Sequence, residues 1–255
     1  MPTTPDPASR TDRAASFAQG ADVYAHVRPT YPAEAVAWML PDGATRVLDL
    51  GAGTGLLTRR LVEHGCLEVV AVDPSEPMLA HLRDTFPQVE AQVGTAEEIP
   101  VPDASVDAVT VGQAWHWFDP ARAAAEIARV LRPGGHLGIV WNDRDERIEW
   151  VARLGEILHR GDRLEPDGAH SVRAPELGEA FDGAERTEHP WGHRMATSDL
   201  RLLAASRSYF LTLPDAEREP LLQQVDDLVV THPDLAGTTE IALPYVTTAY
   251  RARRR

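Results

Sequence analysis

Short apolar runs alternate with amphipathic stretches of helical length between residues 46 and 141 of this 255-residue chain. Apolar runs bounded by turn residues predict buried strands, and apolar side chains spaced three or four apart over about 10 to 12 residues predict helices. Strands that alternate with helices pair in parallel, and the helices pack on both faces of the sheet. The alternation therefore predicts an α/β fold.

The strands predicted in this region are all short: Arg46–Leu50, Glu68–Val72, Glu90–Val93, Ala108–Val111 and His136–Trp141. The helices predicted between them are Thr54–His64, Glu76–Thr85 and Ala121–Leu131. The turn at 132–135, with one proline and two glycines, ends the last of these helices.

Beyond residue 145 the pattern changes to helices that separate two late strands. The predicted helices are Glu146–His159, Asp199–Tyr209 and Asp215–Val230, and the predicted strands are Ala184–Met195 and Ile241–Arg251. The whole pattern predicts a Rossmann-like, seven-stranded, mostly parallel sheet with an antiparallel edge strand, helices on both faces and a helical cap. Sheets of this kind bind ligands outside the carboxyl ends of their strands.

The charge balance and the single cysteine limit the choice of partners and compartment. The chain has 25 Lys and Arg against 39 Asp and Glu, a formal charge of −14. Such a surface argues against nucleic acid and anionic membranes as partners, because both are polyanions. With Cys66 as its one cysteine the chain can form no internal disulfide, which favours a reducing compartment. We therefore expect a cytoplasmic protein.

A glycine-rich loop, 51–55, follows the first predicted strand and precedes a helix. Glycine permits unusual φ values and lets backbone N–H groups approach a ligand closely. A dinucleotide fingerprint would need glycine at position 56, where Leu56 stands. A phosphate-binding P-loop is excluded because no Gly-Lys-Ser/Thr follows. Asp73, which follows the second strand, indicates a ribose-bearing cofactor without choosing one.

Four motifs in sequence order now identify a family. Val47–Gly55 resembles motif I of the class I S-adenosylmethionine (SAM)-dependent methyltransferases, and Val72–Leu79 resembles their second-strand motif. Gly94–Pro100 looks like their adenine-contacting segment, and Leu131–Leu137 is similar to the motif that enters their fifth strand. Together the motifs are highly specific, although each alone is not.

The resemblance implies a role for each motif in binding SAM, whose product is S-adenosylhomocysteine. The glycine loop would pass close to the methionine part, with Asp49 near its ammonium, and Asp73 would hold the ribose hydroxyls. Met78 would pack near the adenine, which Ala96 and Glu97 would hydrogen-bond, and Gln113 would line the methyl end. The implied cofactor-binding residues are Tyr24, Arg28, Asp49, Gly51, Ala52, Gly53, Asp73, Pro74, Met78, Thr95, Ala96, Glu97 and Gln113.

A narrower resemblance covers most of the chain. The segments Tyr24–Pro32, Gln113–Asp119, Trp141–Asp145 and Ser206–Tyr209 look like a subgroup of small-molecule methyltransferases (methyltransferase type 11) that contains trans-aconitate-type enzymes. This resemblance implies that Tyr24 and Arg28 lie at the carboxylate end of the cofactor. The implied substrate-binding residues are Trp115, Trp117, Asn142, Arg144, Arg207 and Tyr209.

His116 is the candidate general base, because it follows the fourth predicted strand and an imidazole with a pKa of about 6.5 can accept a proton at neutral pH. The alternative is a packed ring between Trp115 and Trp117 that only shapes the pocket. Arg144 and Arg207 are candidate partners for a substrate carboxylate. Their alternative is ion pairing with nearby acidic residues, Asp143, Asp145 and Glu146.

The predicted organisation is a flexible tail at 1–15, a SAM-binding core with an N-terminal lid at 16–145, and a helical cap with the last two strands at 146–255. The leading hypothesis is an enzyme that moves a methyl group from SAM to an O, N or C nucleophile of a small molecule, for example at a carboxylate or hydroxyl group. The alternatives are a SAM-binding protein without methyl transfer, which regulates or catalyses another reaction, and a nicotinamide oxidoreductase, which Leu56 disfavours. We expect a monomer or homodimer. We expect no metal, because His159, His170, His189 and His193 show no metal-ligand spacing.

Overall fold

The structure is a computed structural model that describes residues 27–162 and 174–255. The chain divides into two compact units. The first comprises Pro29–Asp143, His170–Trp191 and Tyr245–Arg255, and the second comprises Met1–Arg28, Arg144–Ala169 and Gly192–Pro244. The predicted tail at 1–15, Tyr24 and His170 lie outside the described residues.

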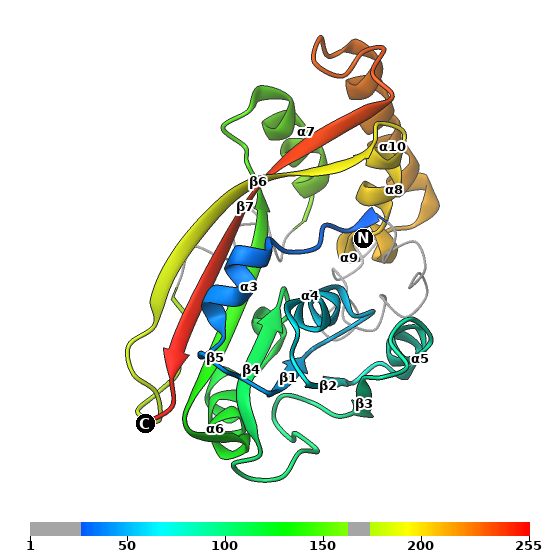
Figure 1. Cartoon of the computed structure of the whole chain (residues 1–255). Helices are drawn as coiled ribbons and strands as arrows, with labels where there is room; N and C mark the ends of the chain where they lie inside the picture. Colours follow the sequence, from blue (N-terminus) through cyan, green and yellow to red (C-terminus); the bar gives the residue numbers. More distant parts are fainter. Residues whose placement is uncertain (1–26, 163–173) are drawn as a thin grey trace, which may run out of the picture. The chain divides into compact units, whose positions relative to one another are not determined.

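A seven-stranded sheet with the order β3-β2-β1-β4-β5-β7-β6 confirms the predicted fold (Figure 1). The strands are β1 (Arg46–Leu50), β2 (Glu68–Asp73), β3 (Glu90–Val93), β4 (Val106–Gly112), β5 (Leu131–Arg144), β6 (Glu185–Ala196) and β7 (Glu240–Arg253). The pairs β1–β2, β1–β4, β2–β3 and β4–β5 are all parallel.

The antiparallel strand is β7, which lies between β5 and β6. Gly134 donates its N–H to the carbonyl of Arg254, and Asp145 donates to that of Pro244. Residue numbers therefore fall along β7 as they rise along β5. The antiparallel strand sits one place in from the edge, and β6 forms the edge itself.

Helices cover both faces of the sheet in the first unit, as the sequence predicts. Side chains alternate along each strand, so neighbouring residues enter opposite layers. Val47 packs in one layer with Met39 of α3 (Ala33–Met39) and Leu61 of α4 (Leu56–His64). Leu48 packs in the other with Ile127 of α6 (Pro120–Val130). Helix α5 (Glu76–Thr85) contributes to the layer of α3 and α4.

The second unit contains the helices of the predicted cap. These are α7 (Glu149–His159), α8 (Asp199–Ala205), α9 (Ser208–Thr212) and α10 (Asp215–Thr231), and α10 packs against α7 and α8. The sequence pattern predicts one helix over Asp199–Tyr209, whereas the structure has two. The break lies at Arg207, whose ψ of 142° is extended rather than helical.

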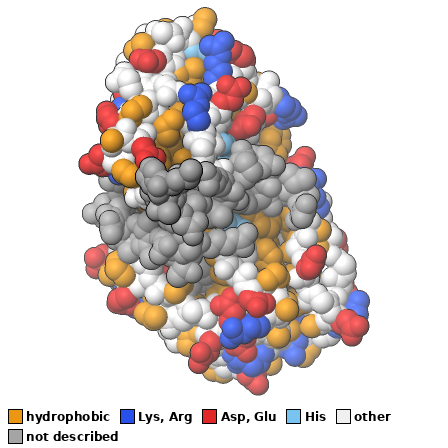
Figure 2. Space-filling view, turned by 180° about the vertical axis from the view of Figure 1, so that it is seen from behind, with side chains coloured by type: hydrophobic (Ala, Val, Ile, Leu, Met, Phe, Trp, Pro, Cys, Tyr) orange, Lys and Arg blue, Asp and Glu red, His pale blue; other side chains and the backbone are white. Residues whose placement is uncertain are grey.

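Figure 2 shows acidic and basic side chains scattered among apolar ones on the face that it views. In the described part of the chain, no helix combines the length and apolar character needed to cross a membrane. Over the same residues, no group of His, Cys, Asp or Glu side chains could hold a metal ion.

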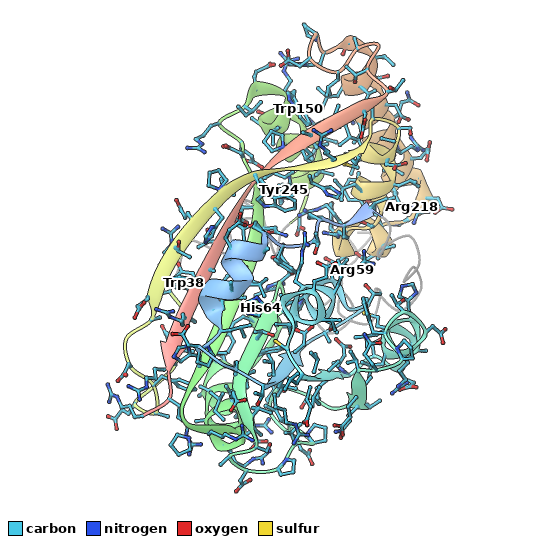
Figure 3. All side chains as sticks on the ribbon, viewed as in Figure 1. Trp38, Arg59, His64, Trp150, Arg218 and Tyr245 are labelled. Atoms are coloured by element: carbon cyan, nitrogen blue, oxygen red, sulfur yellow. The ribbon has the colours of Figure 1, made fainter. Side chains whose placement is uncertain are left out.

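Near the C-terminal end of β7, the Arg251 guanidinium lies 4.6 Å from the centre of the ring of Trp38, which Figure 3 labels.

Candidate functional site

The glycine loop connects the end of β1 to α4 and is held against β2. Gly51 and Ala52 both donate their backbone N–H to the carbonyl of Val72. Gly51 has a φ of +71°, and a Cβ at that position would lie 2.7 Å from the Cβ of Ala114. Position 51 therefore requires glycine both for its backbone conformation and for the close approach of the segment that follows β4.

Asp73 ends β2 beside this loop. Its Oδ2 accepts a hydrogen bond from the Gly53 N–H at 2.9 Å, and its Oδ1 accepts from the Ser75 N–H at 2.8 Å. Burial raises the pKa of this carboxyl, and the two backbone N–H donors oppose the rise. A carboxylate offers about four lone-pair sites, so each oxygen can accept another hydrogen bond from a ligand hydroxyl.

Asp49 lies in β1, with 1% of its surface exposed. Its Oδ2 accepts a 2.6 Å hydrogen bond from the Thr58 hydroxyl, while its buried Oδ1 has no hydrogen-bond partner among the described residues. Burial raises the pKa of Asp49 to about 7; the Thr58 hydrogen bond opposes the rise and the charge of Asp73 adds to it. A buried carboxylate oxygen without a donor is costly, so a cationic ligand group would stabilise it.

These features fit SAM. Asp73 can accept ribose hydroxyls on both of its oxygens, and the Oδ1 of Asp49, which has no partner among the described residues, can accept from an ammonium. Both carboxylates stand at or next to the carboxyl ends of adjacent parallel strands. This is the edge where such sheets bind their ligands.

The predicted adenine-contacting segment follows β3. Ala96 is buried, and Glu97 accepts a hydrogen bond at its Oε1 from the Asp119 N–H at 2.9 Å. Asp119 in turn caps the start of α6 with its side chain. Met78 is buried, and its sulfur lies 3.6 Å from where a Cβ would stand at Gly53. Of the other two predicted contacts, Thr95 forms a bridge with Glu98, and Pro74 is exposed.

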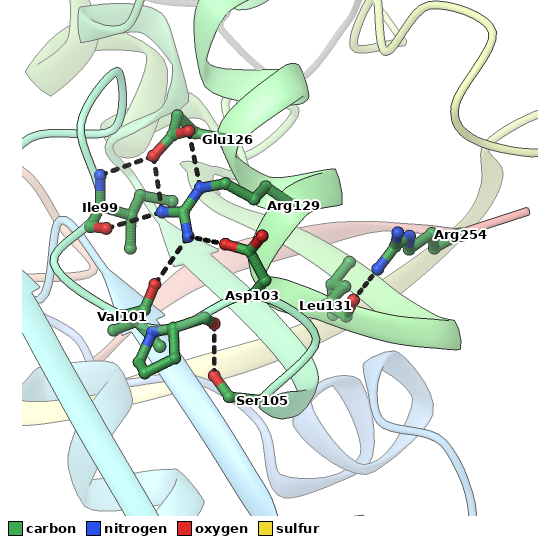
Figure 4. A network of polar contacts seen from close by, with 9 residues as sticks. Ile99, Val101, Asp103, Ser105, Glu126, Arg129, Leu131 and Arg254 are labelled. Carbon is green, nitrogen blue, oxygen red and sulfur yellow. Dashed lines mark hydrogen bonds and ion pairs between the residues drawn. The ribbon is translucent and has the colours of Figure 1, made fainter.

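A single guanidinium fastens the same segment to α6 (Figure 4). Arg129 donates to the carbonyls of Ile99 and Val101 at 2.8 and 2.9 Å, and to Asp103 at 2.7 Å. It also forms an ion pair with Glu126, whose carboxylate accepts from the Ile99 N–H at 3.0 Å. The segment is therefore held at two places along α6. Asp119, at the start of the helix, bonds to Glu97, and Arg129, near the end of the helix, bonds to Ile99 and Val101.

We expect Arg129→Ala to weaken SAM binding about tenfold, because loss of several charge-assisted hydrogen bonds releases the segment that carries Ala96 and Glu97. Isothermal titration with SAM measures the effect. The matched control is Arg122→Ala, an exposed residue on the same helix. Equal affinities in the two variants would show that α6 does not position this segment.

The segment after β4 carries the candidate base. Gln113 has a φ of +56°, and a short 3₁₀ helix, η2 (Trp115–Trp117), follows it. Trp115 is buried edge-on against Phe118, at 5.9 Å between ring centres. His116 is half-buried, and its ring lies 4.6 Å from that of Trp117. Because Ala114 lies against Gly51, this segment flanks the glycine loop.

The structure assigns four of the predicted site residues to the second unit. Arg28 donates to the hydroxyl and the carbonyl of Ser206, at 3.0 and 2.9 Å. Arg144 contacts His159 at 3.0 Å, and Tyr209 donates to the carbonyl of Arg160 at 3.2 Å. Arg207 connects α8 and α9. All other predicted site residues that the structure describes lie in the first unit.

Sequence reasoning missed the residues that hold the site residues in place. Thr58 lies on the helix that the glycine loop begins, so its hydrogen bond to Asp49 has a local signal, a hydroxyl nine residues after the carboxylate. The bonds of Arg129 to the loop have no such signal, because those partners lie 26 to 30 residues away. Asn142 is predicted as a substrate-binding residue, but the sequence gives no sign of its bonds to Thr30 and Thr247, which span 112 and 105 residues.

A sheet of this order, with a glycine loop after β1 and acidic side chains at the ends of β1 and β2, defines a Rossmann-like methyltransferase fold. Residues 48–139 match a methyltransferase domain family. An uncharacterized methyltransferase of Mycobacterium tuberculosis is 53% identical over 244 residues, 96% of this chain and 98% of the relative. The chain belongs to the class I SAM-dependent methyltransferase family, and fold and family together imply SAM as the cofactor.

Two further similarities agree with this assignment. An uncharacterized methyltransferase-like protein of Schizosaccharomyces pombe is 35% identical, covering 91% of this chain and 92% of the relative. The solved structure of a proposed type II methyltransferase from Anaeromyxobacter dehalogenans is 28% identical, with a TM-score of 0.63. That similarity covers 89% of this chain and 97% of the solved one.

Proposed function

We propose that this protein transfers a methyl group from SAM to a nucleophile of a small molecule, as the resemblance to trans-aconitate-type enzymes implies. The observation that carries the proposal is the buried, orphaned oxygen of Asp49 beside Asp73 and the glycine loop. The net charge of −14 favours a small-molecule substrate over nucleic acid, and the single cysteine favours a cytoplasmic location. We propose no resident metal, and a monomer or homodimer as the working form.

The chemistry divides between the cofactor and the chain. SAM, when bound, supplies a methyl group activated on a sulfonium. Asp73 would hold the ribose hydroxyls and Asp49 the ammonium, so the two carboxylates would align the cofactor for transfer. Trp115 and Trp117 wall the pocket and exclude water, and His116 accepts the proton when the nucleophile is a hydroxyl or an amine.

The test is transfer of a radiolabelled methyl group from SAM into a fractionated small-molecule extract, with mass spectrometry of the labelled product. Labelled small molecules that depend on the protein support the proposal. SAM binding without any labelled product would instead favour the alternative, a SAM-binding protein that does not transfer methyl groups. Thermal stabilisation by NAD but not by SAM would contradict both.

We infer that Arg144 binds an anionic group of the substrate. Its side chain is 11% exposed, and its Nε is buried without a hydrogen-bond acceptor in the described part of the chain. The Nη2 of Arg144 lies 3.7 Å from the carboxylate of Glu146, with which it forms an ion pair. The same nitrogen also contacts the ring of His159. A nearly buried guanidinium whose charge is so weakly balanced would bind a carboxylate strongly.

We expect Arg144→Ala to raise the KM for acidic substrates about tenfold or more, and to leave the KM for neutral ones within about twofold, because one charge-assisted hydrogen bond is lost. Steady-state kinetics with the labelled products of the screen measure the two values. Arg147→Ala is the control, since Arg147 is 77% exposed and pairs with Asp145. Equal increases for acidic and neutral substrates would remove Arg144 from the substrate site.

A further inference from the structure

Asn142 is a buried polar residue in β5 whose side-chain nitrogen and oxygen each bond to a protein partner. Its Nδ2 donates to the carbonyl of Thr30 at 2.9 Å, and its Oδ1 accepts from the Thr247 hydroxyl at 2.6 Å. Its backbone carbonyl accepts from the Nε2 of Gln113 at 3.1 Å. All four residues lie in the first unit. Asn142 therefore joins the segment before β1, the end of β4 and strand β7.

The hydrogen bonds continue beyond these neighbours. The Trp191 Nε1–H of β6 donates to the Thr247 hydroxyl at 2.7 Å, which directs the hydroxyl proton of Thr247 to Asn142. On the other side, the Thr30 hydroxyl donates to the carbonyl of Leu56 at 3.3 Å, and Leu56 is the first residue of α4 after the glycine loop. A connected set of hydrogen bonds of this kind holds its parts in one arrangement.

Gln113 is the residue that needs this support. Its φ of +56° places it in the left-handed region, which is unfavourable for a residue with a side chain. Two contacts to β5 hold it there, its N–H to the Val140 carbonyl at 2.9 Å and its side chain to the Asn142 carbonyl. The next residue, Ala114, is the one that closes on Gly51.

The order of the strands indicates which end of the cofactor Gln113 faces. Along the carboxyl edge, the segment with Glu97 follows β3, Asp73 ends β2, Asp49 lies in β1, and Gln113 follows β4. A ligand whose ribose is held at Asp73 and whose ammonium is held at Asp49 runs toward β4. Its adenine then lies on the β3 side, and its methionine end lies on the side of β4 and β5.

We propose that Asn142 is a positioning residue for the methionine end of the cofactor, and that it acts through Gln113 and Thr30; this rests on the proposed SAM site. The side chain of Asn142 fixes the backbone of β5 so that its carbonyl meets Gln113. It also fixes Thr30, which holds the start of α4. The adenine end depends on a different anchor, the hydrogen bonds of Arg129 to the segment after β3.

The test compares two ligands on the full chain by isothermal titration. S-adenosylhomocysteine carries both ends of the cofactor, whereas 5′-methylthioadenosine lacks the amino-acid end. We expect Asn142→Ala to weaken S-adenosylhomocysteine about tenfold and 5′-methylthioadenosine less than about twofold, since only contacts at the amino-acid end are disturbed. Arg129→Ala should weaken both ligands alike. Equal weakening of both ligands by Asn142→Ala would overturn the positioning role and leave the SAM site intact.

A double-mutant cycle separates action through Gln113 from a general loss of packing. In a Gln113→Ala background, Asn142→Ala should weaken S-adenosylhomocysteine by less than about threefold further, because residues that act as a unit are not additive. Fully additive losses would overturn the proposal. Should Asn142→Ala fail to fold, Thr247→Val removes one hydrogen bond of Asn142 and should weaken the same ligand selectively, by about threefold. Wild-type protein that binds neither ligand would overturn the SAM site and the role of Asn142 together.

Discussion

Asp49→Asn is expected to weaken SAM binding about 100-fold at neutral pH. The wild-type carboxylate is almost fully buried and, among the described residues, one of its oxygens has no donor, so an ammonium placed there forms an ion pair shielded from water. Removing one partner of such a pair costs about 3 kcal/mol or more, because the other charge is left without compensation. Asparagine keeps the size of the side chain and an acceptor for the Thr58 hydroxyl, so the change removes mainly the charge.

The same carboxyl makes SAM affinity depend on pH. Without ligand, burial holds the pKa of Asp49 at about 7, so the group is largely protonated in mildly acidic solution. An ammonium binds the ionised form, and below this pKa binding must therefore release a proton. We expect the affinity to rise by up to about tenfold per pH unit between about pH 5 and pH 7, and to level off above. Asp49→Asn should remove this slope.

The stability of the unliganded protein should change in the opposite sense. The pKa of Asp49 is raised from 3.8 to about 7 in the folded state. Its contribution to the free energy of unfolding is therefore fully present below about pH 4 and is lost as the pH rises through about 7. A difference of about three pKa units corresponds to on the order of 4 kcal/mol at most. The asparagine that replaces Asp49 does not titrate. As the pH rises through this range, the free energy of unfolding of Asp49→Asn should therefore increase relative to that of the wild type.

Isothermal titration at several pH values and denaturant unfolding without ligand measure the two effects. Asp84→Asn is the control, because it removes the same charge from an exposed position on α5. A wild-type affinity that does not change between about pH 5 and pH 7 would show that no ligand cation pairs with Asp49. An Asp49→Asn variant that binds SAM normally would contradict the assigned role outright.

The sequence predicts the central part of this site because its signals are local. The glycine loop, Asp49 and Asp73 lie at the ends of adjacent strands in the chain, and the alternation of strands and helices fixes the edge where they meet. The sheet is predicted for the same reason. Helix α3 escapes prediction because it is short, with seven residues, and no side chain caps its start.

The anchors of the site could not be predicted, because each depends on contacts between distant parts of the chain. Nothing in the residues around Asn142 or Arg129 shows that one lies opposite Thr247 and the other opposite the carbonyls of Ile99 and Val101. The break between α8 and α9 is similar. The helical pattern runs through it, and the extended backbone at Arg207 is visible only in the fold.

His116→Ala is expected to lower kcat about 10²- to 10⁴-fold for a hydroxyl or amine substrate, while SAM affinity stays the same. The residue follows β4 on the segment that flanks the glycine loop, which is the side assigned to the methionine end. A substrate hydroxyl loses its proton as the new bond to carbon forms, so a positioned imidazole accelerates the step. A substrate carboxylate arrives ionised, so with such a substrate the variant should keep nearly all of its activity.

The pH dependence of the rate separates a base from a packed ring. If His116 accepts the proton, the wild-type rate should fall as the pH drops and the imidazole becomes protonated, and the variant should lack this limb. Trp117→Phe is the matched control, since it alters the ring that packs against His116 and keeps the imidazole. It should raise KM and preserve the pH limb. A His116→Ala variant with near-normal turnover on a hydroxyl substrate, or one that keeps the wild-type pH profile, would leave His116 only the role of shaping the pocket.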